Sequence, residues 1–297
     1  MKVRVGYGLG TQGLTRDNRF GELVDNLERL GFDSLWLSER ITSSAPDPTV
    51  GLAYAAGRTT KLKFGTSVMV LPGRNPVVLA KELATLDRLS NGRMLPAFGL
   101  GIVQPAEQQA FGVAREERSA WFEEALPLLR RLWSEDSVDH DGPRFSYKGL
   151  TVLPKPVQQP MDVWLGGRAP GELRRVGRLS DGWLPSFCTP ADVAAGRITI
   201  EEAATRADRK IDPEHFGALV PYSDGPLPEA IAAAIAARRP DVDPHEVIAS
   251  GINDARRMLE RFIDEGFSKF VLVPLTEPES WPDELEAVAA EVLPLQT

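Results

Sequence analysis

Three side chains that could do chemistry follow one short apolar run of this sequence. Ser38, Glu39 and Arg40 come directly after residues 34–37 and bring a hydroxyl, a carboxylate and a guanidinium to one turn. A carboxylate beside a guanidinium could bind a charged ligand or stabilise charge that develops during a reaction. The alternative is an ion pair at the protein surface, which is common and contributes little to stability.

A glycine pair marks a second candidate site. The segment GGRAP (166–170) joins the apolar run 162–165 to a predicted helix that carries Arg174, Arg175 and Arg178. Backbone amides at the start of a helix bind anions, and glycines allow an anion to approach closely. Arginine suits phosphate because its planar fork can donate two hydrogen bonds at once. The segment therefore predicts a phosphate site, with a plain strand-to-helix turn beside a solvated basic face as the alternative.

The elements that must position these residues are clearest between residues 63 and 101. An apolar run at 64–69 ends in a Pro-Gly turn, and a helix with leucines at helical spacing begins at Pro76. Asn91-Gly92 ends that helix, and the next run, 94–98, ends in the turn Gly99-Leu100-Gly101. Such glycines usually serve only tight turns. Parallel strands joined by helices form α/β folds, whose ligand sites lie where the strands end.

The same alternation continues along the whole chain and predicts an α/β fold, a (β/α)₈ TIM barrel. We expect one domain over 1–297, with insertions near 138–161 and 222–252, of which the first suits a hairpin. The pattern is weakest around the sixth and seventh strands. The expected strands are 3–8, 34–37, 64–69, 94–98, 162–165, 182–184, 218–221 and 269–273. Further expected helices are 17–30, 49–60, 116–133, 171–179, 191–207, 255–265 and 282–292.

Composition argues against several classes of protein. The chain has 297 residues, of which 42% are hydrophobic and 26% charged, as in ordinary globular proteins. The net charge is -8 with both signs mixed, so nucleic acid is not an expected partner. No apolar run approaches the ~20 residues of a membrane span, and no signal peptide is expected. The single cysteine, Cys188, favours a cytoplasmic location, and the three scattered histidines predict no metal site.

Taken together, the segments resemble one family. The matching segments are GFDSLWLSER (31–40), LKFGTSVMVLPGRNPVVLAKELATLDRLSNGR (62–93), FGLG (98–101) followed by Glu107 and AFG (110–112), PKPVQQP (154–160), WLGG (164–167) and DGWLP (181–185). This combination is similar to the bacterial luciferase-like monooxygenase family, most of all to the branch that uses the deazaflavin coenzyme F420. The resemblance runs from the first expected strand to about Leu184 and returns weakly at the eighth.

The resemblance implies a barrel with a flavin-type ring bound at the carboxyl ends of its strands. It also implies a non-proline cis peptide between Ser67 and Val68, forming a bulge against one face of the ring. The cofactor phosphate is implied to lie on the backbone amides of 166–169. The residues implied to bind the cofactor are Ser38, Glu39, Ser67, Val68, Val70, Glu107, Gly166, Gly167, Arg168 and Ala169.

The sequence departs from the family pattern in two places. Members that oxidise sugar phosphates carry a histidine base where this chain has Arg40, and arginine cannot act as a base near neutral pH. A tryptophan common after the second glycine of the fourth strand is replaced by Ile102-Val103. We therefore predict Glu39 and Arg40 as the catalytic residues. Arg40 would offset negative charge on the reduced ring or clamp an anionic substrate, and Glu39 would orient it.

The expected function is that of an F420-dependent oxidoreductase, which passes a hydride between the deazaflavin and an unidentified organic substrate. One alternative is an FMN-dependent monooxygenase that uses reduced flavin and oxygen, and another is a cofactor-binding protein without turnover. Arg168, Arg174 and Arg175 offer a path for the long acidic tail of F420, which favours that coenzyme modestly. The expected partner is a small-molecule substrate, and a homodimer is expected from the resemblance alone.

Overall fold

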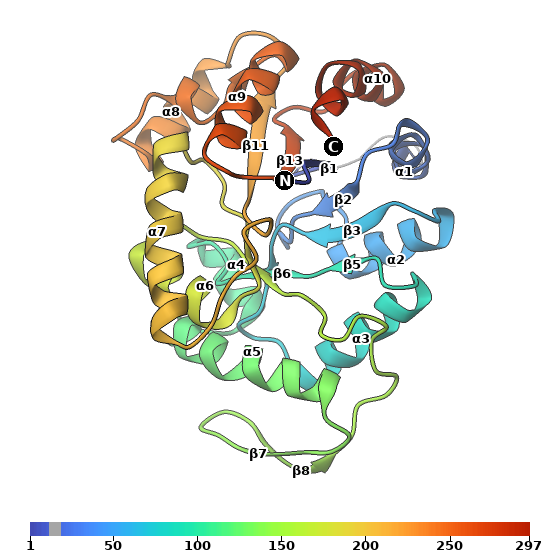
Figure 1. Cartoon of the computed structure of the whole chain (residues 1–297), viewed down its shortest axis with the longest axis vertical. Coiled ribbons are helices and arrows are strands. Elements are labelled where there is room, and N and C mark those ends of the chain that lie inside the picture. The colour runs from blue at the N-terminus through green and yellow to red at the C-terminus, as the bar shows by residue number, and fades with distance from the viewer. Residues whose placement is uncertain (12–18) are drawn as a thin grey trace.

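The computed structural model describes residues 1–11 and 19–297. Parallel strands lie at the centre of the molecule, and helices surround them (Figure 1). The helix expected at 17–30 is present as α1 (Arg19–Leu30), and its expected first two residues lie outside the described part of the chain.

One sheet contains most of the strands and has the order β12-β11-β13-β1-β2-β3-β5. Every neighbouring pair in it is parallel, as expected for strands that are joined by helices. The strands are β1 (Arg4–Gly8), β2 (Ser34–Leu37), β3 (Lys63–Thr66), β5 (Met94–Leu95), β11 (Gly217–Ser223), β12 (Ala249–Ser250) and β13 (Lys269–Pro274).

A second parallel sheet has the order β10-β9-β6-β4 and provides the remaining strands of the barrel. Two isolated parallel bridges, Trp183↔Phe216 and Ser186↔Leu219, connect the β10 side of this sheet to β11. The expected strands 64–69 and 94–98 each appear as two short ones. The first is broken at Ser67–Val68, and the second at Pro96, which has no N–H to donate. The strands are β4 (Met69–Val70), β6 (Ala97–Gly99), β9 (Trp164–Leu165) and β10 (Gly182–Trp183).

Helices connect the strands in the order predicted for a (β/α)₈ barrel. The helix α3 begins after Asn75, whose side chain accepts hydrogen bonds from the amides of Val77 and Val78, and Pro76 takes the first helical position. The helix α4 was not predicted, because seven residues are too few to show a helical period. The bounds are α2 (Pro48–Arg58), α3 (Pro76–Leu89), α4 (Pro105–Phe111), α5 (Arg118–Ser134), α6 (Pro170–Leu179), α7 (Pro190–Arg206), α8 (Glu229–Arg238), α9 (Ile252–Asp264) and α10 (Trp281–Val292).

Two additional segments lie where insertions were expected. Residues 138–150 form an antiparallel hairpin of β7 (Val138–Asp141) and β8 (Ser146–Leu150), which projects at the bottom of Figure 1. The expected hairpin is confirmed. Between β11 and α9 lie α8, a short 3₁₀ turn and β12, which pairs with the end of β11.

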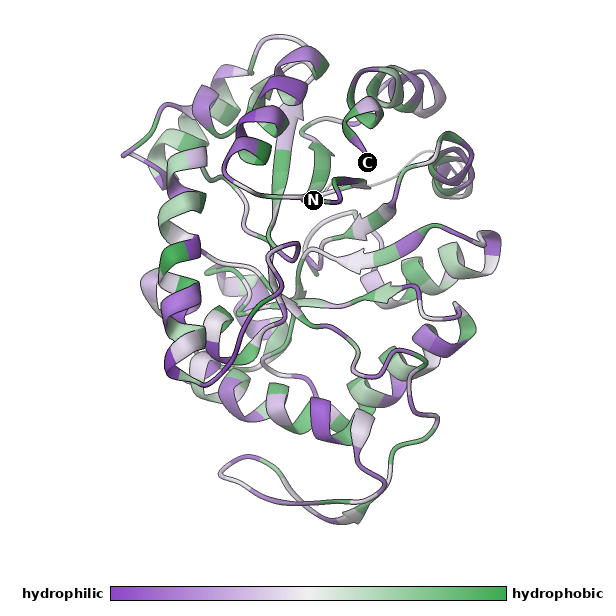
Figure 2. Ribbon diagram, viewed as in Figure 1, coloured by the Kyte–Doolittle hydropathy of each residue, from purple (hydrophilic) through white to green (hydrophobic). Residues whose placement is uncertain are grey.

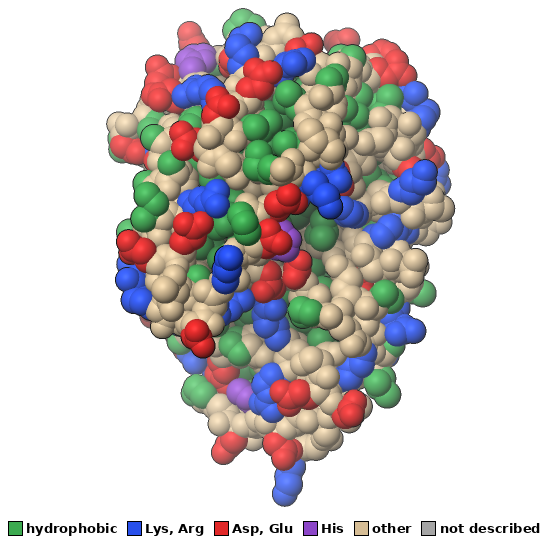
Figure 3. Space-filling model, viewed as in Figure 1, with side chains coloured by type: hydrophobic (Ala, Val, Ile, Leu, Met, Phe, Trp, Pro, Cys, Tyr) green, Lys and Arg blue, Asp and Glu red, His purple; other side chains and the backbone are tan. Residues whose placement is uncertain are grey.

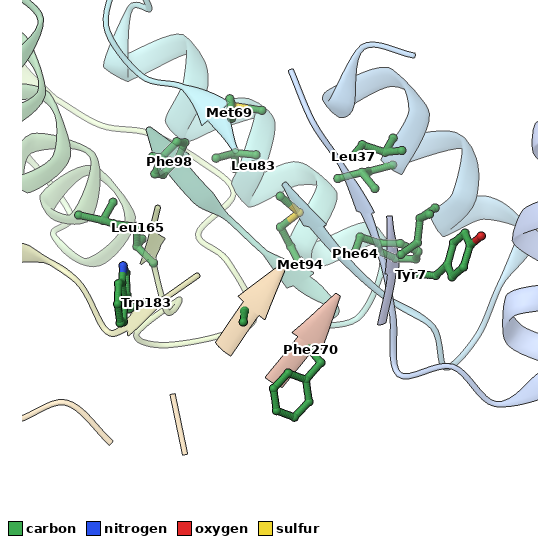
Figure 4. Packing of buried hydrophobic residues seen from close by; sticks show 14 of the residues in the cluster. Tyr7, Leu37, Phe64, Met69, Leu83, Met94, Phe98, Leu165, Trp183 and Phe270 are labelled. Atoms are coloured by element: carbon green, nitrogen blue, oxygen red, sulfur yellow. The ribbon is translucent and has the colours of Figure 1, made fainter. Parts of the chain in front are cut away.

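The main core lies between the strands and the helices. Figure 4 shows part of it, including Phe64, Phe98 and Phe270, which are at most 1% exposed. The helices around the strands alternate between apolar and polar residues (Figure 2), as amphipathic helices do. In the described part of the chain, no helix is both long and apolar enough to cross a membrane.

A second apolar cluster lies apart from the main core and supports the candidate site. It combines side chains from several barrel strands, and the half-buried Val68 packs against it. Its buried members are Trp36, Ala97, Trp164, Leu184, Val271 and Val273.

Candidate active site

A cavity of about 740 Å³ opens where the barrel strands end. This volume lies within the range of small-molecule sites in proteins. Every residue predicted from the sequence to bind cofactor or act in catalysis lines it, although these residues come from four loops far apart in the chain. They are Ser38, Glu39, Arg40, Ser67, Val68, Val70, Glu107, Gly166, Gly167, Arg168 and Ala169.

The peptide bond between Ser67 and Val68 is cis, and Val68 lines the cavity, as the resemblance implied. The end of β2 holds this bulge by two hydrogen bonds. The hydroxyl of Ser38 donates to the carbonyl oxygen of Ser67 at 2.8 Å, and the amide of Glu39 donates to the carbonyl oxygen of Val68 at 3.1 Å. The bulge is therefore fixed to the turn that carries the charged residues.

The side chain of Val68 fills a space that two glycines leave open. A Cβ atom at Gly99 would lie 2.5 Å from Cγ2 of Val68, which is too close for any real contact. A Cβ atom at Gly166 would lie 3.2 Å from Cγ1 of Val68. The glycines at the ends of β6 and β9 therefore have a packing role as well as any role in binding.

Glu39 does not pair with Arg40, and this part of the prediction is wrong. Its carboxylate forms an ion pair with Arg74 and accepts a hydrogen bond from the amide of Val70 at 2.7 Å. Successive side chains of extended backbone point in opposite directions, so neighbours 39 and 40 do not readily meet. Burial raises the pKa of Glu39 above its usual value, and the charge of Arg74 and the Val70 amide offset this only in part. Glu39 thus joins the ends of β2 and β4.

Arg40 is left with its charge available in the cavity. In residues 1–11 and 19–297 no carboxylate lies within ion-pair distance of its guanidinium. Glu107 is the acidic group that Arg40 influences, and the charge of Arg40 helps to lower the pKa of that carboxyl. The two residues predicted as a pair therefore have different roles. Glu39 is buried and connects two strand ends, whereas Arg40 presents its positive charge to the cavity.

The carboxylate of Glu107 holds the loop that follows Arg40. It accepts hydrogen bonds from the amide and hydroxyl of Thr42 at 2.9 and 2.7 Å, and from the amide of Ile41 at 3.4 Å. Burial would raise the pKa of Glu107, but these hydrogen bonds and the charge of Arg40 bring it below its usual value. Glu107 lines the cavity but is only 2% exposed, and its hydrogen bonds hold the Arg40 loop in position.

The backbone amides of the predicted phosphate loop bind a carboxylate from the same chain, that of Glu172. The amides of Arg168 and Ala169 donate hydrogen bonds to one carboxylate oxygen of Glu172, at 3.0 and 2.9 Å. Gly167 has a φ of +95°, and a Cβ atom there would lie 2.6 Å from the Glu172 carboxyl carbon. Only glycine suits that position. The two amides thus donate hydrogen bonds to an anion at the start of α6. A cofactor phosphate could bind to the same donors.

The cavity is also lined by residues that the sequence analysis did not single out, among them Phe187 and Arg238. Phe187 has a φ of +54° and lies under the guanidinium of Arg238, which is 5.6 Å from the ring centre. The neighbouring Arg239 is buried and donates to the carbonyl oxygen of Phe187 at 2.6 Å. Arg239 is itself paired with Asp192 and Asp241. The segment between β11 and α9 therefore reaches the site through this arginine pair.

Comparison with known proteins agrees with this geometry. Residues 3–266 match the sequence model described as luciferase-like monooxygenase. The chain belongs to this family. The resemblance found in the sequence is thereby confirmed.

One curated relative is named as an F420-dependent enzyme. This luciferase-like protein is 33% identical over 177 residues to an F420-dependent glucose-6-phosphate dehydrogenase from Kineococcus radiotolerans, covering 55% of this chain. The chain spans about half, 52%, of that relative.

Solved structures show the same fold. An F420-dependent secondary alcohol dehydrogenase in complex with an F420-acetone adduct superposes with a TM-score of 0.85 at 19% identity, over 100% of both chains. The oxygenating constituent of 3,6-diketocamphane monooxygenase from Pseudomonas putida, in complex with FMN, gives 0.76 at 16% identity, over 100% of this chain and 99% of that one.

Proposed function

We propose that this luciferase-like protein is an F420-dependent oxidoreductase that passes a hydride between the deazaflavin ring and a small organic substrate. One observation carries the proposal: the same cavity is lined by the Val68 bulge and by Arg168 and Ala169, whose backbone amides donate hydrogen bonds to a carboxylate. A ring system with a phosphate attached needs both features. The similarity to a relative named as F420-dependent supports the choice of coenzyme.

The residues of the chain divide the work between binding and electrostatics. Val68 gives the ring an apolar surface, and the loop 166–169 holds the phosphate through its amides. When bound, the deazaflavin supplies the hydride chemistry. Arg40 places a positive charge where negative charge develops on the reduced ring or on an anionic substrate. Glu39 with Arg74, and Glu107 with Thr42, hold the loops on either side of Arg40.

FMN-dependent oxygenation is the second candidate, because FMN also carries a phosphate that these amides could hold. A direct titration distinguishes the two. The purified protein is titrated with F420, with FMN and with riboflavin, and binding is followed by fluorescence. We expect F420 to bind most tightly. Tighter binding of FMN would replace the proposal by the second candidate, and binding of neither would overturn both.

Turnover is tested separately, since a barrel can bind a cofactor without reacting. Bound F420 is mixed under anaerobic conditions with alcohols, aldehydes and sugar phosphates, and its absorbance is followed. Reduction by at least one class is expected. We further propose that the chain acts as one domain within a homodimer, which sedimentation of the purified protein tests.

A further inference from the structure

A second, more open cavity of about 460 Å³ lies on the outer side of α6. The helices α5, α6 and α7, which line it, lie together at the lower left of Figure 1. We call this cavity the arginine groove. Its lining residues are Ser119, Glu123, Gly171, Arg174, Arg175, Arg178, Ala203, Arg206 and Ala207.

The charge of the arginine groove is opposite to that of the protein. Four arginines and a single carboxylate line it, whereas the whole chain has a net charge of -8. On the face drawn in Figure 3, acidic and basic side chains are mixed, with no comparable excess of one sign. A concave surface lined by charge of one sign concentrates ligands of the other sign.

Only part of this positive charge is used within the protein. Glu123 accepts hydrogen bonds from Arg175 at 2.9 Å and from Arg178 at 2.7 and 2.9 Å. Arg174 has no hydrogen-bond or ion-pair partner in the described part of the chain. Arg206 has only the exposed Glu202, at 3.7 Å. Two guanidiniums in the groove are therefore available to a ligand.

The arginine groove adjoins the coenzyme cavity. Arg175 lines both cavities, Ala169 and Pro170 line the first, and Gly171 lines the second. A Cβ atom at Gly171 would meet nothing within 4 Å, so packing does not require glycine there. Glycine nevertheless leaves the passage between the two cavities open, because it places no side chain between the phosphate loop and the arginines.

We propose that the arginine groove binds the chain of carboxylates that follows the phosphate of coenzyme F420. This inference rests on the proposed function and extends it to a site outside the barrel mouth. Arg174 and Arg178 are one helical turn apart on α6, about 6 Å along its axis, so they can meet different carboxylates of one flexible tail. Arg206 contacts the same tail from α7, while Glu123 keeps Arg175 and Arg178 in place.

The test compares two forms of F420 that differ only in the tail, together with a deazaflavin that has neither phosphate nor tail. Dissociation constants are measured by fluorescence at low and high salt for F420 with several glutamates, F420 with one, and the deazaflavin without phosphate or tail. In the wild type, the longer tail should tighten binding about 5- to 10-fold at low salt, and less at high salt. The double variant Arg174→Ser/Arg206→Ser should lose most of this gain. The matched control, Arg257→Ser/Arg261→Ser on α9, should keep it.

Two further measurements keep the outcomes separate. Gly171→Glu, which places a negative charge in the passage between the two cavities, should weaken binding of the long-tailed coenzyme more than that of the short-tailed one. An oligo-γ-glutamate peptide alone should bind the wild type and not the arginine double variant. If the affinity for F420 does not depend on the length of its tail at low or at high salt, the groove proposal is overturned and the proposed function stands. If F420 does not bind and FMN does, both are overturned.

Discussion

The carboxylate of Glu172 accepts a hydrogen bond from the backbone amide of Ala169 at 2.9 Å, within the loop expected to hold a cofactor phosphate. The side chain thus caps its own helix with an internal anion. A phosphate that approaches this loop meets a negative charge already bound there. Two like charges cannot share the same donors without cost, so Glu172 must turn away or weaken binding.

Replacing Glu172 by Ala should therefore tighten the binding of phosphate-bearing cofactors. We expect an affinity gain of about 5- to 10-fold for F420 or FMN, because roughly 1 kcal/mol of competing charge is removed. Riboflavin, which has no phosphate, should not gain. Stability should fall by about 0.5–2 kcal/mol, since the cap is lost. Titration calorimetry with both flavins measures the difference.

Asp283→Ala is the matched control for Glu172→Ala, because it removes an acidic residue from the first turn of α10. It should leave both affinities unchanged. Weaker binding of the phosphate-bearing cofactor by Glu172→Ala would show that Glu172 supports the binding conformation of the loop instead of competing for its amides.

Arg40→Ala should slow hydride transfer and leave cofactor affinity largely intact. A cation that meets charge developing in the transition state is worth about 2.7–4 kcal/mol, so the rate should fall by roughly 10²–10³-fold. The rate of Arg40→Lys should lie between those of the wild type and Arg40→Ala, because lysine keeps the charge and loses the planar fork. Stopped-flow absorbance of bound deazaflavin gives the rate. If affinity falls and the rate at saturation is kept, Arg40 is a binding anchor.

Glu39→Ala should act first on stability. Removing one partner of a buried ion pair leaves the other without compensation, and because Arg74 is partly exposed we expect the free energy of unfolding to fall by about 3 kcal/mol. Glu39→Gln should cost less, because its amide oxygen can still accept from the Val70 N–H. Urea unfolding of both variants, and of each with Arg74→Gln, measures the coupling. Unchanged stability with lost turnover would return Glu39 to the catalytic role predicted from the sequence.

Glu28 predicts a pH dependence of stability. Burial would raise its pKa, but hydrogen bonds from the amides of Leu62, Thr60 and Lys61 outweigh it and lower the pKa from 4.5 to about 2. The folded protein therefore binds this proton less readily than the unfolded chain. The stabilisation is present above pH 4.5 and is lost as the pH falls toward 2. After allowance for solvent screening, it is about 1–2 kcal/mol.

Urea unfolding of Glu28→Gln at several pH values checks this. The variant should be less stable than the wild type at pH 7, and the difference should shrink as the pH is lowered to 3. Glu22→Gln, in the same helix, is the control. A difference that stays constant with pH would mean that the hydrogen bonds to Glu28 do not depend on its charge.

Much of the fold could be predicted from the sequence because the signals are local. Apolar runs, proline starts and glycine stops marked the eight strand positions and most helices. The break within 64–69 was anticipated by the family resemblance, which implied a cis peptide and a bulge at Ser67–Val68. The break within 94–98 was missed, since an apolar run looks continuous whatever its backbone does. The weak pattern around the sixth and seventh strands matches the place where only isolated bridges, such as Trp183↔Phe216, connect the sheets.

The site could be predicted as a set of loops but not as a set of contacts. Loops that follow parallel strands converge at one end of a barrel, so Ser38, Val68 and Gly166 could be placed together. Partners depend on the direction of each side chain in three dimensions. The pairing of Glu39 with Arg74 therefore could not be read from the chain, and neither could the hydrogen bonds that Glu172 accepts.

The space shared by Val68, Gly99 and Gly166 has an evolutionary consequence. The three positions lie far apart in the chain, in the break between β3 and β4, at the end of β6 and directly after β9, yet their side chains would share one volume. A methyl group gained at 99 has to be matched by atoms lost at 68, and one gained at 166 requires Val68 to shift slightly, so substitutions at these positions should occur together across diverging lineages. Residue 68 should be smallest in those lineages where Gly99 has become alanine.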